Sequence, residues 1–294
     1  MNDINMEGKK IMRDFDLRGL QLAELQMLKD FAKFCDENDI TYFLSDGTLL
    51  GAIRHQGFIP WDDDIDVCMD VHNYRKLLKV APKKLPKKYF FQNYRTDYKV
   101  GVKWSRVRIN GTTSMERNMT HYDIHYGVCM DIFVMAGIPK SKIRRKIQKE
   151  ASHWLAILLE KYGNEAAGFE VPTKLKLLYE YIPDGLRLLI CKFLERMVLV
   201  NTAKCDLCYS TEWLDAQVAR TCLPTRIFSV KNREKRMFED TEFYVPGRWK
   251  EYLELVFGDW KKLPPEAERV GHGDIIVDLE NDYSIYFTGE KNRK

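Results

Sequence analysis

Four aspartates lie close together in the segment SDGTLLGAIRHQGFIPWDDDIDVCMD, which begins at Ser45. Asp64 and Asp66 are two residues apart at the start of an apolar run. Within a strand, side chains two residues apart point to the same face, about 7 Å from each other. Two carboxylates this close repel each other unless a cation lies between them. The spacing therefore predicts a site for a hard divalent cation, Mg²⁺ or Mn²⁺, shared with a phosphate-bearing substrate.

A third carboxylate is expected from a neighbouring strand. Asp131 lies inside the apolar run VCMDIFVM, where an unpaired charge would be costly. We therefore interpret Asp131 as a third ligand of the same cation. Taken alone, the DDD run is more often a solvated surface or a helix cap, so that alternative stays open for it.

The elements around these residues form an ordered unit. Gly47 and Thr48 follow a predicted strand over 40–45 and open a predicted helix over 48–55, where backbone N–H groups can bind a phosphate. The DxD pattern lies at the start of the next predicted strand, 65–69. This order of strand, glycine turn, helix and strand favours a substrate site over a solvated loop.

The first 138 residues are expected to form a mixed β-sheet core flanked by helices. An apolar stripe at helical spacing predicts a helix over 18–37, with Glu24 on its polar side. Asp70 is predicted to cap a helix that ends before Pro82. Aromatic and β-branched residues predict further strands over 89–92, 100–109 and 126–135.

The remainder is expected to be largely helical, which gives an α+β fold class. We predict a helical insertion or subdomain over 139–225, and a segment over 226–294 that completes the core with a strand over 241–246 and a helix after it. The tail after Lys291 is expected to be disordered.

Composition excludes several classes of protein. The net charge of +4 is too small to indicate nucleic-acid binding, and no nucleic-acid-binding motif is present. No signal peptide and no membrane-spanning run is expected. Seven cysteines without a disulfide-like rhythm suit a cytoplasmic protein, and Cys205 and Cys208 lack the second pair that a zinc site needs.

The basic helical middle has two open interpretations: ordinary packing helices with solvated lysines, or a platform that meets the inner face of a membrane.

The segment SDGTLLGAIRHQGFIPWDDDIDVCM resembles the signature of the LicD family, which includes bacterial phosphocholine transferases and is related to fukutin and the fukutin-related proteins. The resemblance implies a nucleotidyltransferase-like fold. It places the glycine turn at Gly47 and Thr48, the DxD at Asp64 and Asp66, and the third aspartate at Asp131. Weaker similarity covers the strand with Lys103, Arg106 and Arg108, the run FGDWKKLPP (257–265), and the pair Arg269 and His272.

The resemblance implies transfer of a phosphorylated alcohol, with phosphocholine favoured, from a CDP-activated donor to a hydroxyl of a cell-surface glycan. Teichoic acid, lipopolysaccharide and capsule are the candidate acceptors, including lipid-linked forms. Metal ions on the three aspartates would neutralise the diphosphate, with Asp131 as ligand or as base for the acceptor hydroxyl.

The resemblance also suggests which residues bind the substrates. Arg54, Lys103 and Arg106 are the candidates for stabilising charge on the transferred phosphoryl group, and for Arg54 the role of a surface partner of the aspartate run stays open. Asp62 and Asp63 would be outer ligands or turn caps, and His55 and His272 are more often structural. A quaternary ammonium would need an aromatic cage, for which the candidates are Trp61, Trp104, Tyr122 and Tyr126.

Three other functions stay open. A GT-A glycosyltransferase also binds a metal and a nucleotide-sugar diphosphate through a DxD. A nucleotidyltransferase acting on a small hydroxyl compound would share the metal site and differ only in its products. A non-enzymatic regulator that binds a divalent ion or a glycan would keep the aspartates for structure alone.

Overall fold

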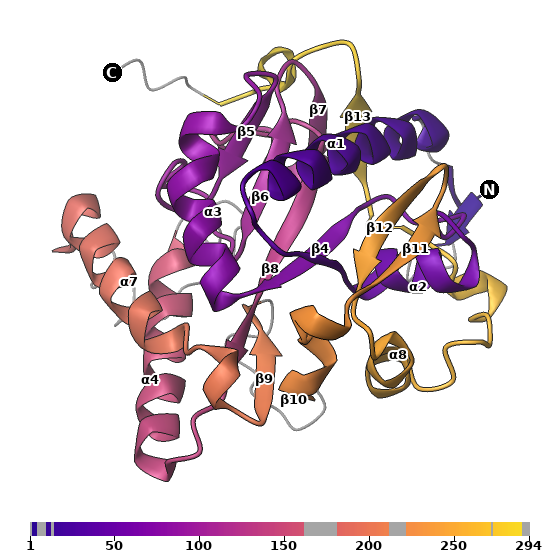
Figure 1. Ribbon diagram of the computed structural model, residues 1–294. Helices are drawn as coiled ribbons and strands as arrows, with labels where there is room; N and C mark the ends of the chain where they lie inside the picture. Colours follow the sequence, from indigo (N-terminus) through magenta and orange to yellow (C-terminus); the bar gives the residue numbers. More distant parts are fainter. Residues whose placement is uncertain are drawn as a thin grey trace.

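A mixed β-sheet runs through the middle of the computed structural model, which describes residues 2–4, 10–12, 15–161, 181–211, 222–271 and 273–289 (Figure 1). Its strands are β3 (Phe43–Leu44), β4 (Asp66–Asp70), β5 (Tyr89–Gln92), β6 (Ser105–Ile109), β8 (Cys129–Gly137), β9 (Leu207–Ser210) and β10 (Cys222–Pro224). Strand β4 pairs antiparallel with β3 and parallel with β8. The other edge of β8 pairs first with β6 and then with β9, both antiparallel.

The two central strands are apolar because both lie inside the main core. Val67 and Met69 of β4, and Ile132 and Val134 of β8, are almost completely buried. Such near-continuous apolar runs are typical of strands covered on both faces. Polar residues in these strands therefore stand out, and they gather near the start of β4.

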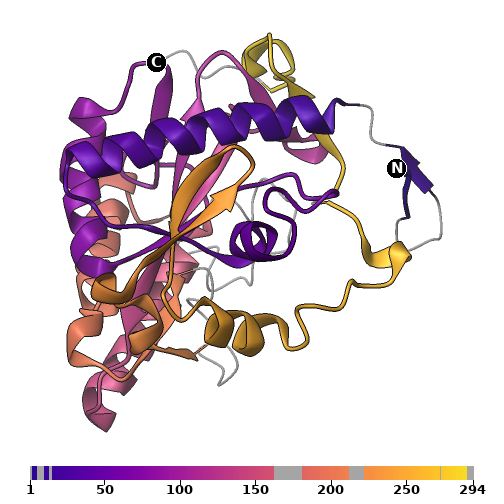
Figure 2. The same ribbon diagram turned by 45° about the vertical axis from the view of Figure 1, so that its right-hand side comes forward.

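Six α-helices lie in the part of the chain that the structure describes: α1 (Leu17–Glu37), α2 (Asp46–Arg54), α3 (Val71–Lys84), α4 (Lys142–Leu159), α7 (Asp184–Val198) and α8 (Trp249–Phe257). Figure 2 shows α1 along the top of the molecule, with the hairpin of β11 (Glu234–Phe238) and β12 (Thr241–Val245) beneath it. Helices α4 and α7 pack together at one corner (Figure 1). None of the described helices has the length and apolar content that a membrane crossing requires.

Besides the β11–β12 hairpin, two small antiparallel sheets lie outside the central one in the described part of the chain. Strand β7 (Thr113–Glu116) pairs with β13 (Ile275–Asp278), which connects the C-terminal part of the chain to the first half. Strand β1 (Asn2–Ile4) pairs with β2 (Lys10–Met12) near the N-terminus.

The predicted α+β class is confirmed, and the local differences have physical reasons. The predicted strand over 100–109 begins only at Ser105. Helix α3 does not end before Pro82 but continues to Lys84. Pro82 lies in its last turn and removes one helical N–H donor, while the Leu85 N–H still bonds to the Ala81 carbonyl. In the described part of the segment 139–225, α4 and α7 are helical and β9 and β10 extend the central sheet. The predicted helical stretch over 162–180 and the tail after Lys291 lie outside the described residues.

Candidate active site

The start of β4 and the start of β8 bring two carboxylates together. Asp66 is the first residue of β4, and its register partner on the parallel strand β8 is Asp131. The structure therefore places these two residues, distant in the sequence, side by side in the sheet. This is the position that was expected for a third carboxylate on a neighbouring strand.

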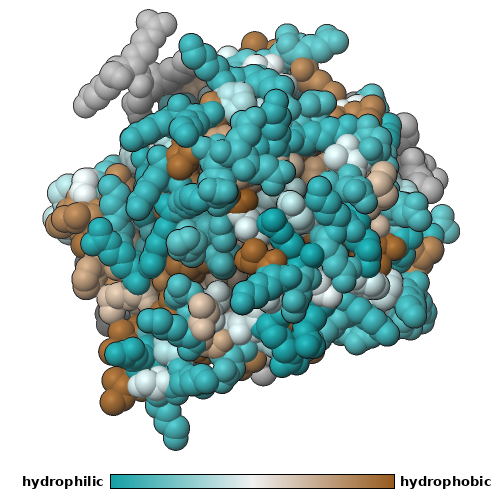
Figure 3. Space-filling model, in the orientation of Figure 1, coloured by the Kyte–Doolittle hydropathy of each residue, from teal (hydrophilic) through white to brown (hydrophobic). Residues whose placement is uncertain are grey.

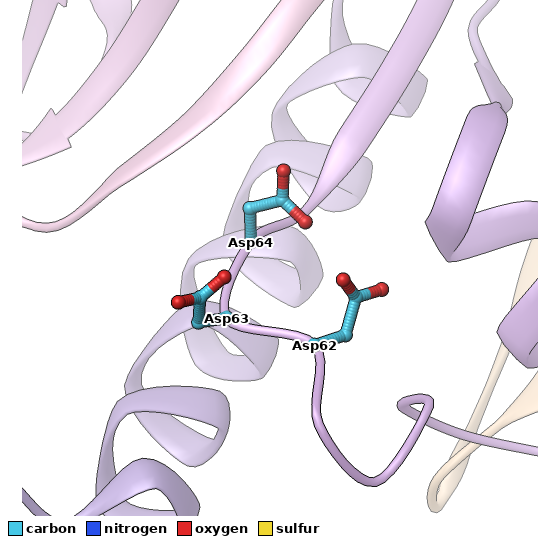
Figure 4. A group of neighbouring side chains, drawn as sticks. All are labelled: Asp62, Asp63 and Asp64. Carbon is cyan, nitrogen blue, oxygen red and sulfur yellow. The ribbon is translucent and has the colours of Figure 1, made fainter. Parts of the chain in front are cut away.

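Three further aspartates, Asp62, Asp63 and Asp64, lie in the loop that enters β4, which we call the acidic loop. One carboxylate oxygen each from Asp62, Asp63 and Asp64 lies within 4.8 Å of the others (Figure 4). The expectation that Asp64 and Asp66 share one strand is wrong, because β4 begins only at Asp66. Asp64 lies in the loop, so its side chain does not follow the alternating directions of strand residues. It can therefore meet the side chains of Asp62 and Asp63.

Negative charge gathers at the acidic site, by which we mean Asp62, Asp63, Asp64, Asp66 and Asp131. Burial raises the pKa of Asp66 well above its usual range, and the charges of Asp64, Asp46, Asp131 and Asp62 add to the effect. Carboxylate oxygens are the ligands that hard cations such as Mg²⁺ prefer. The donor set therefore fits a divalent cation, which would remove the repulsion among these groups.

Glu24 is an acidic residue that the sequence analysis missed. It was expected on the polar side of α1, but it is buried. Burial raises its pKa well above the usual range, and Asp64 is the next largest cause. Its Oε2 atom is buried and has no hydrogen-bond partner among the described residues. The available signal was its position four residues after Leu20, which lies on the buried face of α1.

Arg106 is a cation on the strand that pairs with β8. It lies opposite Asp131 in the β6–β8 register. Its Nε donates to Asp131 Oδ1 at 2.6 Å, and Nη2 donates to Oδ2 at 3.3 Å. Burial alone would lower the pKa of the guanidinium, but Asp131 outweighs it and the net pKa is raised. A permanent positive charge thus lies at the edge of the acidic site.

The glycine turn positions the strand and the acidic loop. The buried Thr48 Oγ1 accepts a hydrogen bond from the Asp66 backbone N–H at 2.8 Å. A Cβ atom on Gly47 would lie 2.9 Å from Asp62 Oδ2, so a larger residue at this position would require the Asp62 carboxylate to move. Thr48 therefore holds the start of β4, and its hydroxyl is already used for that purpose.

Tyr252 of α8 holds the same turn by binding Asp46, the first residue of α2. The sequence analysis missed both residues. Asp46 has a φ of +46°, in the left-handed region. The Tyr252 hydroxyl donates to Asp46 Oδ1 at 2.8 Å and accepts from the Asp46 backbone N–H at 3.2 Å. Burial raises the pKa of Asp46, and these hydrogen bonds partly offset the effect. Nothing in the spacing of these two residues connects them in the sequence.

Trp61 and two arginines form one side of the acidic loop. The Arg269 guanidinium lies 5.4 Å from the centre of the Trp61 ring, and His55 meets that ring edge-on at 6.4 Å between centroids. Arg54 Nη1 donates to the Trp260 carbonyl at 2.9 Å. Burial lowers the pKa of Arg54, while Asp62 acts in the opposite direction.

Trp104 lies beside Arg106 at the edge of the acidic site, whereas the described contacts of the other predicted site residues lie elsewhere. Lys103 makes an ion pair with Glu160 at the end of α4, with Nζ 2.7 Å from Oε1, so its described ion pair points to the α4 side rather than to the aspartates. Trp104 packs against Phe133 and Arg106. The remaining cage candidates, Tyr122 and Tyr126, belong to a separate small cluster. His272 lies outside the described residues.

The chain is similar to one family model and to several known proteins. Residues 39–151 match the family model described as LicD/FKTN/FKRP, nucleotidyltransferase domain. Over 282 residues the chain is 27% identical to the lipopolysaccharide cholinephosphotransferase LicD of Haemophilus influenzae, covering 89% of this chain and 97% of that protein. An uncharacterised protein of Rickettsia prowazekii is 32% identical over 114 residues, which is 39% of this chain and 34% of that protein.

Proposed function

We propose that this chain is a phosphotransferase that moves phosphocholine from a CDP-activated donor to a hydroxyl of a cell-surface glycan, because its residues 39–151 match the LicD/FKTN/FKRP family model. The similarity to a lipopolysaccharide cholinephosphotransferase supports both the group and a lipopolysaccharide-type acceptor. The observation that carries the proposal is the meeting of Asp66, Asp131 and Arg106 across three adjacent strands. The mixed sheet around them supports a nucleotidyltransferase-like core.

The carboxylates would hold the divalent cations that this chemistry requires. Asp66 and Asp131, with Asp64 and its neighbours in the acidic loop, offer only oxygen ligands, which suits Mg²⁺ or Mn²⁺. When bound, such ions neutralise the donor diphosphate. Each carboxylate oxygen has a second lone pair, so Asp131 can accept from Arg106 and still bind a cation.

The protein's own groups would orient the reactants. Arg106 keeps its charge at the edge of the site, where it can stabilise negative charge on the transferred phosphoryl group. The Trp61 ring already lies beside one cation, the Arg269 guanidinium. That geometry supports Trp61 as a contact for the choline ammonium, because ring faces attract quaternary ammonium groups in the same way.

We place the reaction in the cytoplasm, with the glycan acceptor reached there. All seven cysteines are unpaired thiols, which is in line with a reducing compartment.

The test is to incubate the purified protein with Mg²⁺, a glycan acceptor, and CDP-choline, CDP-glycerol or CDP-ribitol. Release of CMP together with a phosphocholine-bearing glycan is the expected result. Asp64→Asn and Asp131→Asn should lower turnover by roughly 10²–10³-fold, since each removes a charge that the reaction uses. Asp39→Asn is the matched control, because Asp39 is exposed and asparagine tolerates its left-handed backbone.

Other products would assign the site differently. Pyrophosphate released from a nucleoside triphosphate would indicate a nucleotidyltransferase, and sugar transfer from a nucleotide-sugar would indicate a glycosyltransferase. Turnover that survives both aspartate variants would contradict a catalytic role for the acidic site.

A further inference from the structure

Helix α7 presents apolar side chains to solvent and charged side chains to the protein. Leu186, Leu189 and Phe193 lie one turn apart on its outer face and are 49%, 64% and 60% exposed. Its inner face carries the buried Arg187 and Glu195. A surface helix ordinarily has the opposite arrangement, with its apolar stripe toward the core.

The buried charges fix this orientation. Arg187 Nη1 donates to the Leu158 carbonyl at 3.0 Å, and Nη2 donates to the Tyr98 carbonyl at 2.8 Å. Glu195 makes an ion pair with Arg95. Rotating α7 to hide its leucines would leave these groups buried without partners, which costs more than exposing the apolar face.

The apolar face is bordered by cations. Lys192 and Arg196 are exposed on the outer side of α7, and Glu195, its one carboxylate after Asp184, is buried in an ion pair. Gln148 of α4 donates to the Val198 carbonyl at 2.8 Å, so the basic start of α4 lies beside the end of α7. The exposed basic residues there are Lys142, Arg144, Arg145, Lys146 and Lys149.

Helix α4 extends the apolar surface. Ile143, Ile147 and Trp154 are exposed at helical spacing on its outer side. Figure 3 shows hydrophobic residues at the left and lower-left edge of the molecule, where Figure 1 places α7 and α4. The surface therefore combines protruding apolar side chains with a dense group of positive charges.

We propose that the outer faces of α4 and α7 dock on an anionic phospholipid surface. Leu186, Leu189 and Phe193 enter the boundary between headgroups and acyl chains, and the surrounding lysines and arginines contact headgroup phosphates. Apolar burial and attraction to anionic lipid are the two contributions that hold an interfacial helix. This inference goes beyond the proposed function and does not rest on it.

The test is sedimentation of the full chain with vesicles of phosphatidylcholine alone or mixed with phosphatidylglycerol. Wild type should bind the anionic vesicles at low salt and lose binding at high salt. Leu189→Gln/Phe193→Gln should weaken binding by about tenfold or more. Lys192→Gln and Arg196→Gln should each weaken it by roughly fivefold.

The matched control is Leu22→Gln/Leu255→Gln, which replaces two equally exposed leucines on α1 and α8 and should leave binding unchanged. A wild type that does not bind anionic vesicles, or a Leu189→Gln/Phe193→Gln variant that binds like wild type, would overturn the proposal. So would a wild-type dimer that the same double variant converts to monomer, because the face would then belong to a second copy. CMP release with a soluble acceptor should be unaffected, which separates this test from that of the catalytic site.

Discussion

At the scale of single residues, Asp131 has the most fully determined surroundings in the acidic site. One neighbouring strand places Asp66 beside it, and the other places Arg106 opposite it. Strand register fixes where the backbones of Arg106 and Asp131 lie relative to each other, and the two hydrogen bonds from Arg106 orient the Asp131 carboxylate. Backbone pairing therefore positions Asp66, Asp131 and Arg106, whereas Asp62, Asp63 and Asp64 are positioned by the loop.

His125 provides a test at the same scale. Its Nδ1 accepts from the Gly127 backbone N–H at 3.1 Å, and its Nε2 lies 2.9 Å from Asn110 Oδ1. Only a neutral ring satisfies both contacts. Burial, and secondarily the charge of Arg108, lowers the pKa of His125 to about 4.

The unfolded chain takes up a proton on this histidine near pH 6.5, whereas the folded protein does so only near pH 4. The contribution of His125 to the free energy of unfolding is therefore fully present above pH 6.5 and is lost as the pH falls toward 4. Between pH 7 and about 4.5, the free energy of unfolding measured with urea should fall by about 2 kcal/mol less in His125→Gln than in wild type, allowing for solvent around the half-buried ring. His72→Gln, at an exposed histidine, is the control. If the free energy of unfolding changed equally with pH in wild type, His125→Gln and His72→Gln, a neutral buried His125 would be contradicted.

At the scale of elements, the junction between α2 and β4 positions the acidic site. The hydroxyl of Thr48, in the first turn of α2, binds the backbone of the residue that opens β4. Tyr252 of α8 binds the residue before the glycine turn. Two helices thus fix the point at which the acidic loop becomes a strand.

Thr48→Val tests this junction because it keeps the shape of the side chain and removes the hydroxyl. The buried Asp66 N–H would then lack a partner, which should lower the free energy of unfolding by about 1–3 kcal/mol. Thr48→Ser keeps the hydroxyl and should cost about 1 kcal/mol or less. Urea titration of both variants measures the difference, and a valine variant as stable as the serine variant would show that the hydrogen bond contributes nothing.

The sequence predicted those elements whose pattern is local. Helix 18–37 and strand 89–92 agree with α1 and β5, and the Asp70 cap is confirmed by its 2.8 Å hydrogen bond from the Asn73 N–H. The position of Asp64 before β4 was missed because a strand's first residue depends on its pairing partner. Glu24 and Tyr252 were missed because their roles depend on contacts between distant segments, which periodicity does not report.

At the scale of the whole molecule, β8 connects the acidic site to the corner formed by α4 and α7. Asp131 lies near its start, and the carbonyl of its last residue, Gly137, accepts from Gln148 of α4 at 2.8 Å. The same amide reaches the end of α7. The corner is therefore attached to the strand that carries the candidate ligand.

Arg187 tests how the corner is held. Arg187→Met should remove the donors to two carbonyls and lower the free energy of unfolding by roughly 2–5 kcal/mol. The acidic site should keep its activity at temperatures where the variant is folded, since the described contacts of Arg187 do not reach it. Arg196→Met changes an exposed residue and should stay within about 0.5 kcal/mol of wild type. Loss of activity in a folded Arg187→Met variant would indicate that the corner also shapes the site.

The length of β8 separates the two proposed contacts of the protein. From Asp131 to Gly137 the strand covers about 20 Å at about 3.3 Å per residue. A bilayer docked on α4 and α7, as proposed, would therefore contact the protein at a distance from the acidic site. A lipid-linked acceptor would have to span that distance, so we expect turnover of such acceptors to rise with the length of their glycan chain.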